Sequence, residues 1–121
     1  MITVLQSDGE NNPDILAGVG ASAALVTSTI PWNGPIASVR VCRIDNKFLI
    51  NPTRLEVENS DIEMIVSGNK ETVVMVEGEA NEVNEATVVD ALRFAQKNIV
   101  EIISVQEKLV SSITVDKLEE P

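Results

Sequence analysis

Two carboxylates, Asp61 and Glu63, are the residues whose types and spacing best suit chemistry. They lie two positions apart in a segment that alternates apolar and polar residues, so a strand would place both on one face. Carboxylate oxygens are the ligands that Mg²⁺ and Ca²⁺ prefer, and this pair is a weak candidate for holding a cation. A solvated strand face explains the same pattern, and we favour that interpretation. The chain contains no histidine, which removes the commonest general base and metal ligand.

Arg40 and the charge balance bear on nucleic-acid binding. Arg40 lies in a predicted strand, where it either pairs with a carboxylate at the surface or, in a ring-shaped assembly, faces an RNA channel. We favour the ion pair and keep the channel as the weaker candidate. Nine basic residues stand against nineteen acidic ones, giving a formal net charge of −10. Because nucleic-acid binding draws most of its affinity from basic side chains that neutralise phosphates, this chain alone is expected to repel RNA.

The N-terminal part of the chain predicts a strand, an acidic loop and a helix. Ile2–Leu5 is rich in β-branched residues and predicts the strand. Asn12-Pro13-Asp14 predicts the helix start, because Asn12 can cap free N–H groups and Pro13 suits the first helical position. Asp14 complements the positive end of the helix dipole. The predicted helix, Ile15–Ile30, is covered mostly by alanine and glycine, so we expect it to be buried against a sheet.

The rest of the chain predicts four strands and a long helix. The strands are expected at Ile36–Ile44, Phe48–Ile50, Asp61–Ser67 and Thr72–Gly78. A turn at Asp45-Asn46-Lys47 joins the first two, and Arg54–Ser60 is expected to be irregular or one helical turn. From Asn84, apolar residues at helical spacing predict a helix of about 25 residues. The predicted order is β-α-β-β-β-β-α, an α+β fold with two helices packed on one face of a mostly antiparallel or mixed sheet.

Length and composition predict one domain. We expect it to cover residues 1–115, followed by an acidic C-terminal tail over 116–121. No apolar run is long enough to span a membrane and no leader segment precedes the predicted first strand, so a cytoplasmic protein without a membrane partner is expected.

Four stretches carry a resemblance to a known family: DGENNPDILAGVGASAALVTSTIPWNGPI, VRVCRIDNKFLINPT, IVSG and NEVNEATVVDALRFA. They resemble the second half of the first RNase PH-like core domain of the polynucleotide phosphorylase family, and the resemblance covers nearly the whole chain. It implies an RNase PH-like half-domain. In bacterial enzymes of this family only the second such domain is catalytic, so the resemblance implies that this piece is not.

The resemblance also indicates where the family's catalytic groups would fall. The serines that hold the attacking phosphate fall on Asn12, Pro13 and Asp14, a degenerate loop that lacks a donor and adds a carboxylate. One catalytic aspartate falls on Glu63 and its neighbouring lysine on Ile65. The other aspartate falls near Asn51 or Pro52. We therefore expect no catalytic residue, no phosphate site and no metal site, with Asp61 and Glu63 as the weak metal candidates.

The family implies a function for the whole enzyme rather than for this piece. It implies a trimeric ring of RNase PH-like core domains that shortens RNA from the 3′ end, using inorganic phosphate and Mg²⁺. The expected role of this chain is structural: it is predicted to be inactive alone, to need no cofactor, to pair with other core domains, and to meet RNA only through the assembly. The alternative is a stand-alone module that self-associates and has no RNA activity, because a half-domain leaves a sheet edge and an apolar face uncovered.

Overall fold

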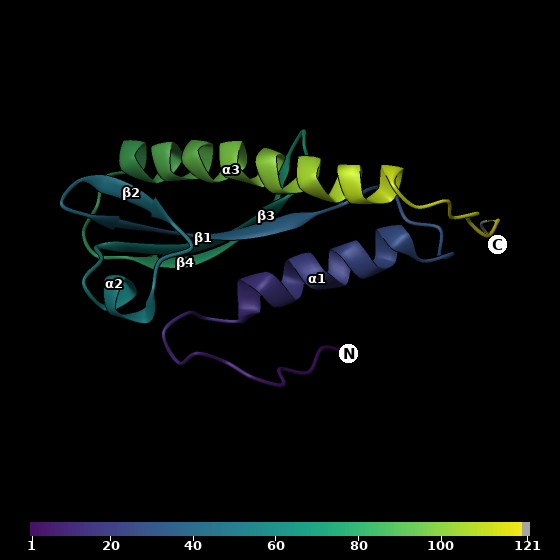
Figure 1. The fold of residues 1–121 in the computed structure, drawn as a ribbon. Coiled ribbons are helices and arrows are strands. Elements are labelled where there is room, and N and C mark those ends of the chain that lie inside the picture. The colour runs from purple at the N-terminus through teal and green to yellow at the C-terminus, as the bar shows by residue number, and fades with distance from the viewer. Residues whose placement is uncertain (120–121) are drawn as a thin grey trace.

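A four-stranded sheet with three helices around it makes up the computed structural model, which describes residues 1–119 (Figure 1). The elements are, in chain order, α1 (Asp14–Thr27), β1 (Ala37–Ile44), β2 (Lys47–Ile50), α2 (Arg54–Glu58), β3 (Ile62–Gly68), β4 (Val73–Ala80) and α3 (Glu85–Ser111). The predicted α+β class is confirmed, as are the four strands and the long C-terminal helix. Within this part of the chain, no helix has the length and apolar character that crossing a membrane requires.

The strands are all antiparallel and lie in the order β2-β1-β3-β4. The predicted hairpin turn between β1 and β2 is confirmed at Asp45 and Asn46, whose φ angles of +49° and +62° are those of a two-residue type I′ turn. Cys42 pairs with Leu49 across this hairpin. Because β2 has four residues and β1 has eight, the first half of β1 has a strand neighbour only on the β3 side.

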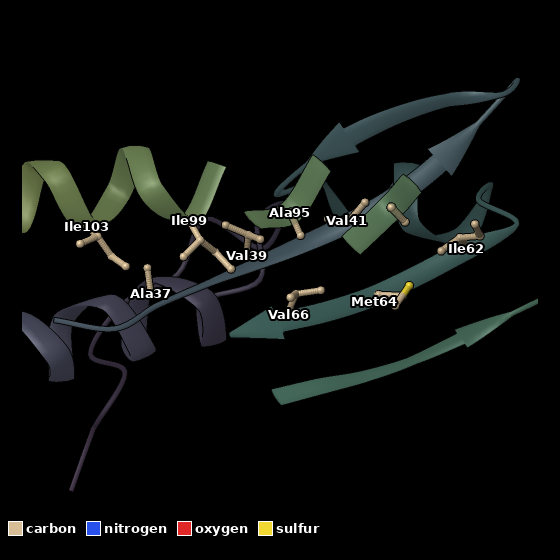
Figure 2. Close-up of a cluster of buried hydrophobic side chains, with 10 residues drawn as sticks. Ala37, Val39, Val41, Ile62, Met64, Val66, Ala95, Ile99 and Ile103 are labelled. Atoms are coloured by element: carbon tan, nitrogen blue, oxygen red, sulfur yellow. The ribbon is translucent and has the colours of Figure 1, made fainter. Parts of the chain in front are cut away.

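The apolar core lies between α3 and one face of the sheet. The α3 residues that face it recur every four positions: Ala91, Ala95, Ile99 and Ile103. They pack on alternate residues of β1 and β3: Ala37, Val39, Val41, Ile62, Met64 and Val66. Figure 2 shows Ala95, Ile99 and Ile103 pointing toward these strands. The predicted start of α3 is confirmed, because the Asn84 side chain caps the helix by accepting the N–H of Thr87 at 2.9 Å.

α1 lies on the opposite face of β1. Ser38 and Arg40 alternate with the core residue Val39 and so point away from α3. Gly18 of α1 is so close to β1 that an added Cβ would lie 3.5 Å from Ser38 Oγ, and Asp14 pairs with Arg40. The expectation that both long helices share one face is therefore wrong, and Figure 1 shows α3 on one side of the sheet and α1 and α2 on the other. The polar residues of β1 look like a solvated face in the sequence, whereas the small residues of α1 cover them.

The strand predicted at Ile2–Leu5 is also wrong. These residues have no regular secondary structure and are exposed, and Met1 and Ile2 line a hollow with Ala17, Gly20 and Ala21 of α1. β-branched residues favour a strand only where a neighbouring strand supplies hydrogen bonds, and no strand in residues 1–119 lies beside this segment.

The C-terminal segment returns to α1. Lys117 Nζ donates to the carbonyl oxygens of Leu25 (3.1 Å), Val26 (3.1 Å) and Ser28 (2.7 Å), and the Leu118 N–H donates to that of Thr29 (2.8 Å). We call these contacts the C-terminal clasp. The last turn of α1 has no basic residue of its own, so Lys117 supplies the positive charge that a helix C-terminus favours. Glu120 and Pro121, the end of the predicted acidic tail, lie outside the described residues.

Candidate functional site

The loop that leads into α1 is held by Asp8. Its Oδ1 accepts the N–H groups of Glu10 (2.9 Å) and Asn11 (2.8 Å), and its Oδ2 accepts a bond from the Asn11 side chain (2.7 Å). These bonds, led by that from the Asn11 N–H, hold the pKa of the Asp8 carboxyl below its ordinary value. The Glu10 carbonyl accepts the N–H of Arg54 at 3.0 Å, which ties the loop to the start of α2. The loop therefore has a defined position against the rest of the fold.

α1 begins differently from the prediction. Pro13 is the N-cap residue, with φ −80° and ψ −10°, and no side chain caps the helix, so the cap expected from Asn12 is wrong. The proline already has helical angles, and its ring restricts any change of φ. Asp14 is the first helical residue, and its Oδ1 accepts the N–H of Ile15 at 2.8 Å. Because a helix N-terminus favours anions, the Asp14 carboxylate occupies the place that would otherwise suit a phosphate.

Arg40 joins two of the candidate carboxylates. One guanidinium nitrogen donates to Asp14 Oδ2 at 2.5 Å, and the other pairs with Glu63 Oε1. The Arg40 residue is only 9% exposed, while the side chains of Asp14 and Glu63 are 48% and 34% exposed. We call these three residues the Arg40 cluster. Its formal charge is −1, because one guanidinium faces two carboxylates. The sequence predicted an ion pair for Arg40, and the structure adds burial and a second carboxylate.

Asn51 fixes the backbone of Arg40. The Arg40 N–H donates to Asn51 Oδ1 at 2.9 Å, and the Asn51 N–H donates to the Arg40 carbonyl at 2.7 Å. These two bonds replace the strand partner that β2 no longer provides at this position. Asn51 has φ +48°, a left-handed conformation that asparagine adopts more readily than most residues. The residue that follows β2 thus positions the arginine on β1.

Asp61 and Glu63 line one hollow together with Glu79, but they pair with different arginines. Asp61 takes a different arginine: Arg43 Nε donates to Asp61 Oδ1 at 2.9 Å and a second guanidinium nitrogen donates to Oδ2. These hydrogen bonds from Arg43 hold the pKa of the Asp61 carboxyl below its ordinary value and raise that of Arg43. Glu63 pairs with Arg40. Among residues 1–119, no three histidine, cysteine, aspartate or glutamate side chains come together as a metal site would need.

A cavity of about 250 Å³ opens beside the Arg40 cluster. Its polar lining includes Asn11, Asn12 and Asn51. Its apolar wall comes from both long helices and includes Ile15, Val19 and Ile102. The positions that the family resemblance assigns to catalytic groups therefore do converge. They hold amides, proline, Ile65 and two carboxylates, Asp14 and Glu63, that share one arginine.

Sequence reasoning named most of these residues singly and missed how they meet. It did not foresee that Asp14 and Glu63, 49 positions apart in the chain, share one arginine. The available signal was Arg40 itself, a charged residue in a strand whose neighbours Val39 and Val41 are apolar. The pairing depends on α1 packing on the polar face of β1, which the pattern of residues did not predict.

Comparison with known proteins places the chain in a family. Residues 34–98 match domain 2 of the 3′ exoribonuclease family, which is just over half of the chain. The polyribonucleotide nucleotidyltransferase of Thermus thermophilus is 48% identical over 118 residues, covering 98% of this chain and 16% of that protein. That of Geotalea uraniireducens is 48% identical over 121 residues, covering 100% of this chain and 17% of that protein. That of Sorangium cellulosum is 44% identical over 117 residues, covering 97% of this chain and 16% of that protein.

The chain thus spans about a sixth of the length of the curated relatives that it matches. The match covers the sheet and the first half of α3, and the relatives extend it over α1 and the loop before it. With these identities over nearly its full length, the chain belongs to the 3′ exoribonuclease family, as an RNase PH-like domain of the polyribonucleotide nucleotidyltransferase kind.

Proposed function

We propose that this chain is a structural part of a polyribonucleotide nucleotidyltransferase, in the first and non-catalytic of its two RNase PH-like core domains. The observation that carries the proposal is the Asp14 carboxylate at the N-terminus of α1, paired with the buried Arg40. A phosphate bound there would lie beside that carboxylate. Two unit charges of the same sign about 4 Å apart repel by about 4 kcal/mol at an effective dielectric constant near 20.

The separate arginine partners of Asp61 and Glu63 support the same conclusion for metal ions. Phosphoryl-transfer sites with two metals use carboxylates that share the ions, whereas each of these carboxylates pairs with its own arginine. A cation would have to compete with a guanidinium at both positions. We therefore place no Mg²⁺ on this chain, and we assign Mg²⁺ and inorganic phosphate to the catalytic domain of the parent enzyme.

In the whole enzyme we propose that the chain helps to build a trimeric ring of RNase PH-like core domains in the cytoplasm. The ring would degrade RNA from the 3′ end by phosphorolysis and release nucleoside diphosphates. The formal net charge of −10 supports a role away from the RNA backbone. Arg40 also fits this role, because both terminal nitrogens of its guanidinium already meet carboxylates. RNA would reach this part only through the assembly.

Phosphorolysis of a short RNA by the purified chain, with Mg²⁺ and phosphate present, tests the proposal. The polyribonucleotide nucleotidyltransferase of Thermus thermophilus serves as the positive control. We expect no nucleoside diphosphate above the level of a sample without protein. Release by this chain would show that its site is functional, and the proposal would then be wrong.

A phosphate titration tests the carboxylate argument directly. We expect no saturable shift of the Ile15 and Leu16 amide signals in the unchanged chain. Asp14→Ser should create one, because it frees the N–H of Ile15 and one side of Arg40. Asp90→Ser, which removes an exposed carboxylate from α3, is the matched control and should change nothing. Saturation of the unchanged chain at millimolar phosphate would contradict the proposal.

A further inference from the structure

β4 is an edge strand, and no strand in residues 1–119 lies beside its outer side. Seven of its eight residues are exposed. The Asn81 N–H donates to the Asp61 carbonyl, on the β3 side, at 2.9 Å. Because alternate residues of an antiparallel strand bond to the same neighbour, the backbone groups of Glu77 and Glu79 also face β3. Those of Val76 and Gly78 point outward, where a further strand would bind.

The side chains of β4 differ between its two faces. On the face toward α3, Val76 lies beside the buried Val66 and is itself 45% exposed. On the other face, Glu77 lies beside Ile65 and Glu79 beside Glu63. Unlike Glu63, neither Glu77 nor Glu79 forms an ion pair with any residue in 1–119.

A hollow of about 250 Å³ lies over the acidic face of β4. Glu63, Glu77 and Glu79 line it together with Arg40. Since Arg40 already pairs with Asp14 and Glu63, it leaves the charges of Glu77 and Glu79 uncompensated. The edge therefore combines outward backbone groups, an apolar side chain on one face and two carboxylates on the other.

We propose that the outer edge of β4 binds an extended protein segment as a fifth strand. Lysine or arginine residues of that segment would face Glu77 and Glu79, and its apolar residues would cover Val76. Strand addition takes affinity from main-chain hydrogen bonds and specificity from alternate side chains, and both are set by the arrangement described above. This inference concerns the outer edge of β4 and does not depend on whether the chain is catalytic.

A second copy of the chain does not fit this edge. Two antiparallel β4 strands would bring Glu77 and Glu79 of one copy opposite, or diagonal to, the same residues of the other. Like charges in such cross-strand positions are destabilising, and each copy carries a net charge of −10. Charged side chains are a common protection of edge strands against self-pairing. A basic segment instead gains from the same charges.

Hydrogen exchange followed by NMR tests the proposal on the 121-residue chain. The probe is an eight-residue peptide that alternates lysine and valine. We expect it to slow exchange of the outward Val76 and Gly78 amides at least tenfold. A peptide that alternates glutamate and valine should leave both unchanged. No protection by the lysine peptide, protection by both peptides, or protection in a self-associated chain without peptide would each overturn the proposal.

Two double variants separate the edge from a general effect of charge. Glu77→Lys with Glu79→Lys should weaken binding of the lysine peptide at least tenfold. Glu58→Lys with Glu101→Lys changes the net charge equally, at exposed positions on α2 and α3, and should weaken it less than twofold. Equal losses in the two variants would mean that net charge alone attracts the peptide. Circular dichroism and the exchange of core amides check that both variants are folded.

Discussion

The two faces of β1 are built with different chemistry. Toward α3, Val39 and Val41 are completely buried among aliphatic side chains. Toward α1, Ser38 bonds the Ser67 hydroxyl at 2.7 Å and Arg40 meets two carboxylates. An apolar face gains free energy from every side chain removed from water, whereas a buried polar face roughly balances desolvation against its new bonds. We therefore expect stability to come mainly from the α3 face and the position of α1 to come from the polar one.

The largest expected effect is on the α3 face. Ile99 has no exposed surface, so Ile99→Ala should lower the free energy of unfolding by about 3 kcal/mol through lost burial and the cavity left behind. Val105→Ala on the same helix, where the side chain is 65% exposed, should change it by less than about 0.5 kcal/mol. Urea denaturation measures both. Similar losses would mean that α3 does not pack as described.

The second largest effects are expected at two glycines that differ in how closely other atoms approach them. A Cβ added to Gly78 would lie 2.3 Å from the Glu63 carbonyl oxygen, so Gly78→Ala should cost about 2 kcal/mol through strain. A Cβ on Gly20 of α1 would meet no atom within 4 Å, and Gly20→Ala should stabilise the chain by up to about 1 kcal/mol through helix propensity. Opposite signs in thermal denaturation are the expected result. A loss at Gly20 would show that this side of α1 is more tightly covered than described.

The polar face should respond less strongly. Arg40→Leu removes the partner of Asp14 and Glu63 and should cost about 1–2 kcal/mol, because both carboxylates remain partly solvated. Arg93→Leu breaks the exposed pair with Asp90 and should cost less than about 0.5 kcal/mol. Urea denaturation of both variants makes the comparison. If Arg40→Leu lowered the free energy of unfolding as much as Ile99→Ala, stability would not come mainly from the α3 face of β1.

The smallest effect concerns acid. Arg43 lowers the pKa of Asp61, so the folded state binds this proton less readily than the unfolded chain does. The resulting stability is present above the unfolded pKa of about 3.9 and is lost as the pH falls through the lower folded pKa. Asp61→Asn should therefore lower stability at pH 7 and have little effect near pH 2. Urea denaturation at the two pH values gives the difference, and Arg43→Leu should show the same trend. An equal loss of stability at both pH values would mean that the ion pair with Arg43 does not lower the pKa of Asp61.

Periodic apolar residues predicted most of the fold. The spacing in α3 and the alternation in β1 and β3 reflect burial against a neighbour, and all four strands and α3 are where the sequence placed them. The strand predicted at Ile2–Leu5 was wrong because strand propensity does not supply a partner strand. The side of the sheet on which α1 packs was predicted wrongly for a related reason. Ser38 and Arg40 are polar, and no periodicity distinguishes a solvated polar face from one covered by a helix.

The candidate site was predictable in its parts. The family resemblance located Asp14, Asn51 and Glu63 as the positions to examine, and Arg40 was identified as a charged residue within a strand. Their meeting was not predictable, because it depends on α1 crossing the polar face of β1. The cap expected from Asn12 failed on a local detail, the helical angles of Pro13.

The C-terminal clasp has a consequence for the rates of folding and unfolding. Lys117 contacts the Leu25 carbonyl across 92 positions of sequence, whereas each hairpin joins neighbouring segments. Closing so long a loop costs chain entropy. We therefore expect this contact to form after the strands of the sheet have paired and to be absent from the folding transition state. Interactions of that kind slow unfolding and leave the folding rate nearly unchanged. The clasp would thus set how long α1 stays docked on the sheet.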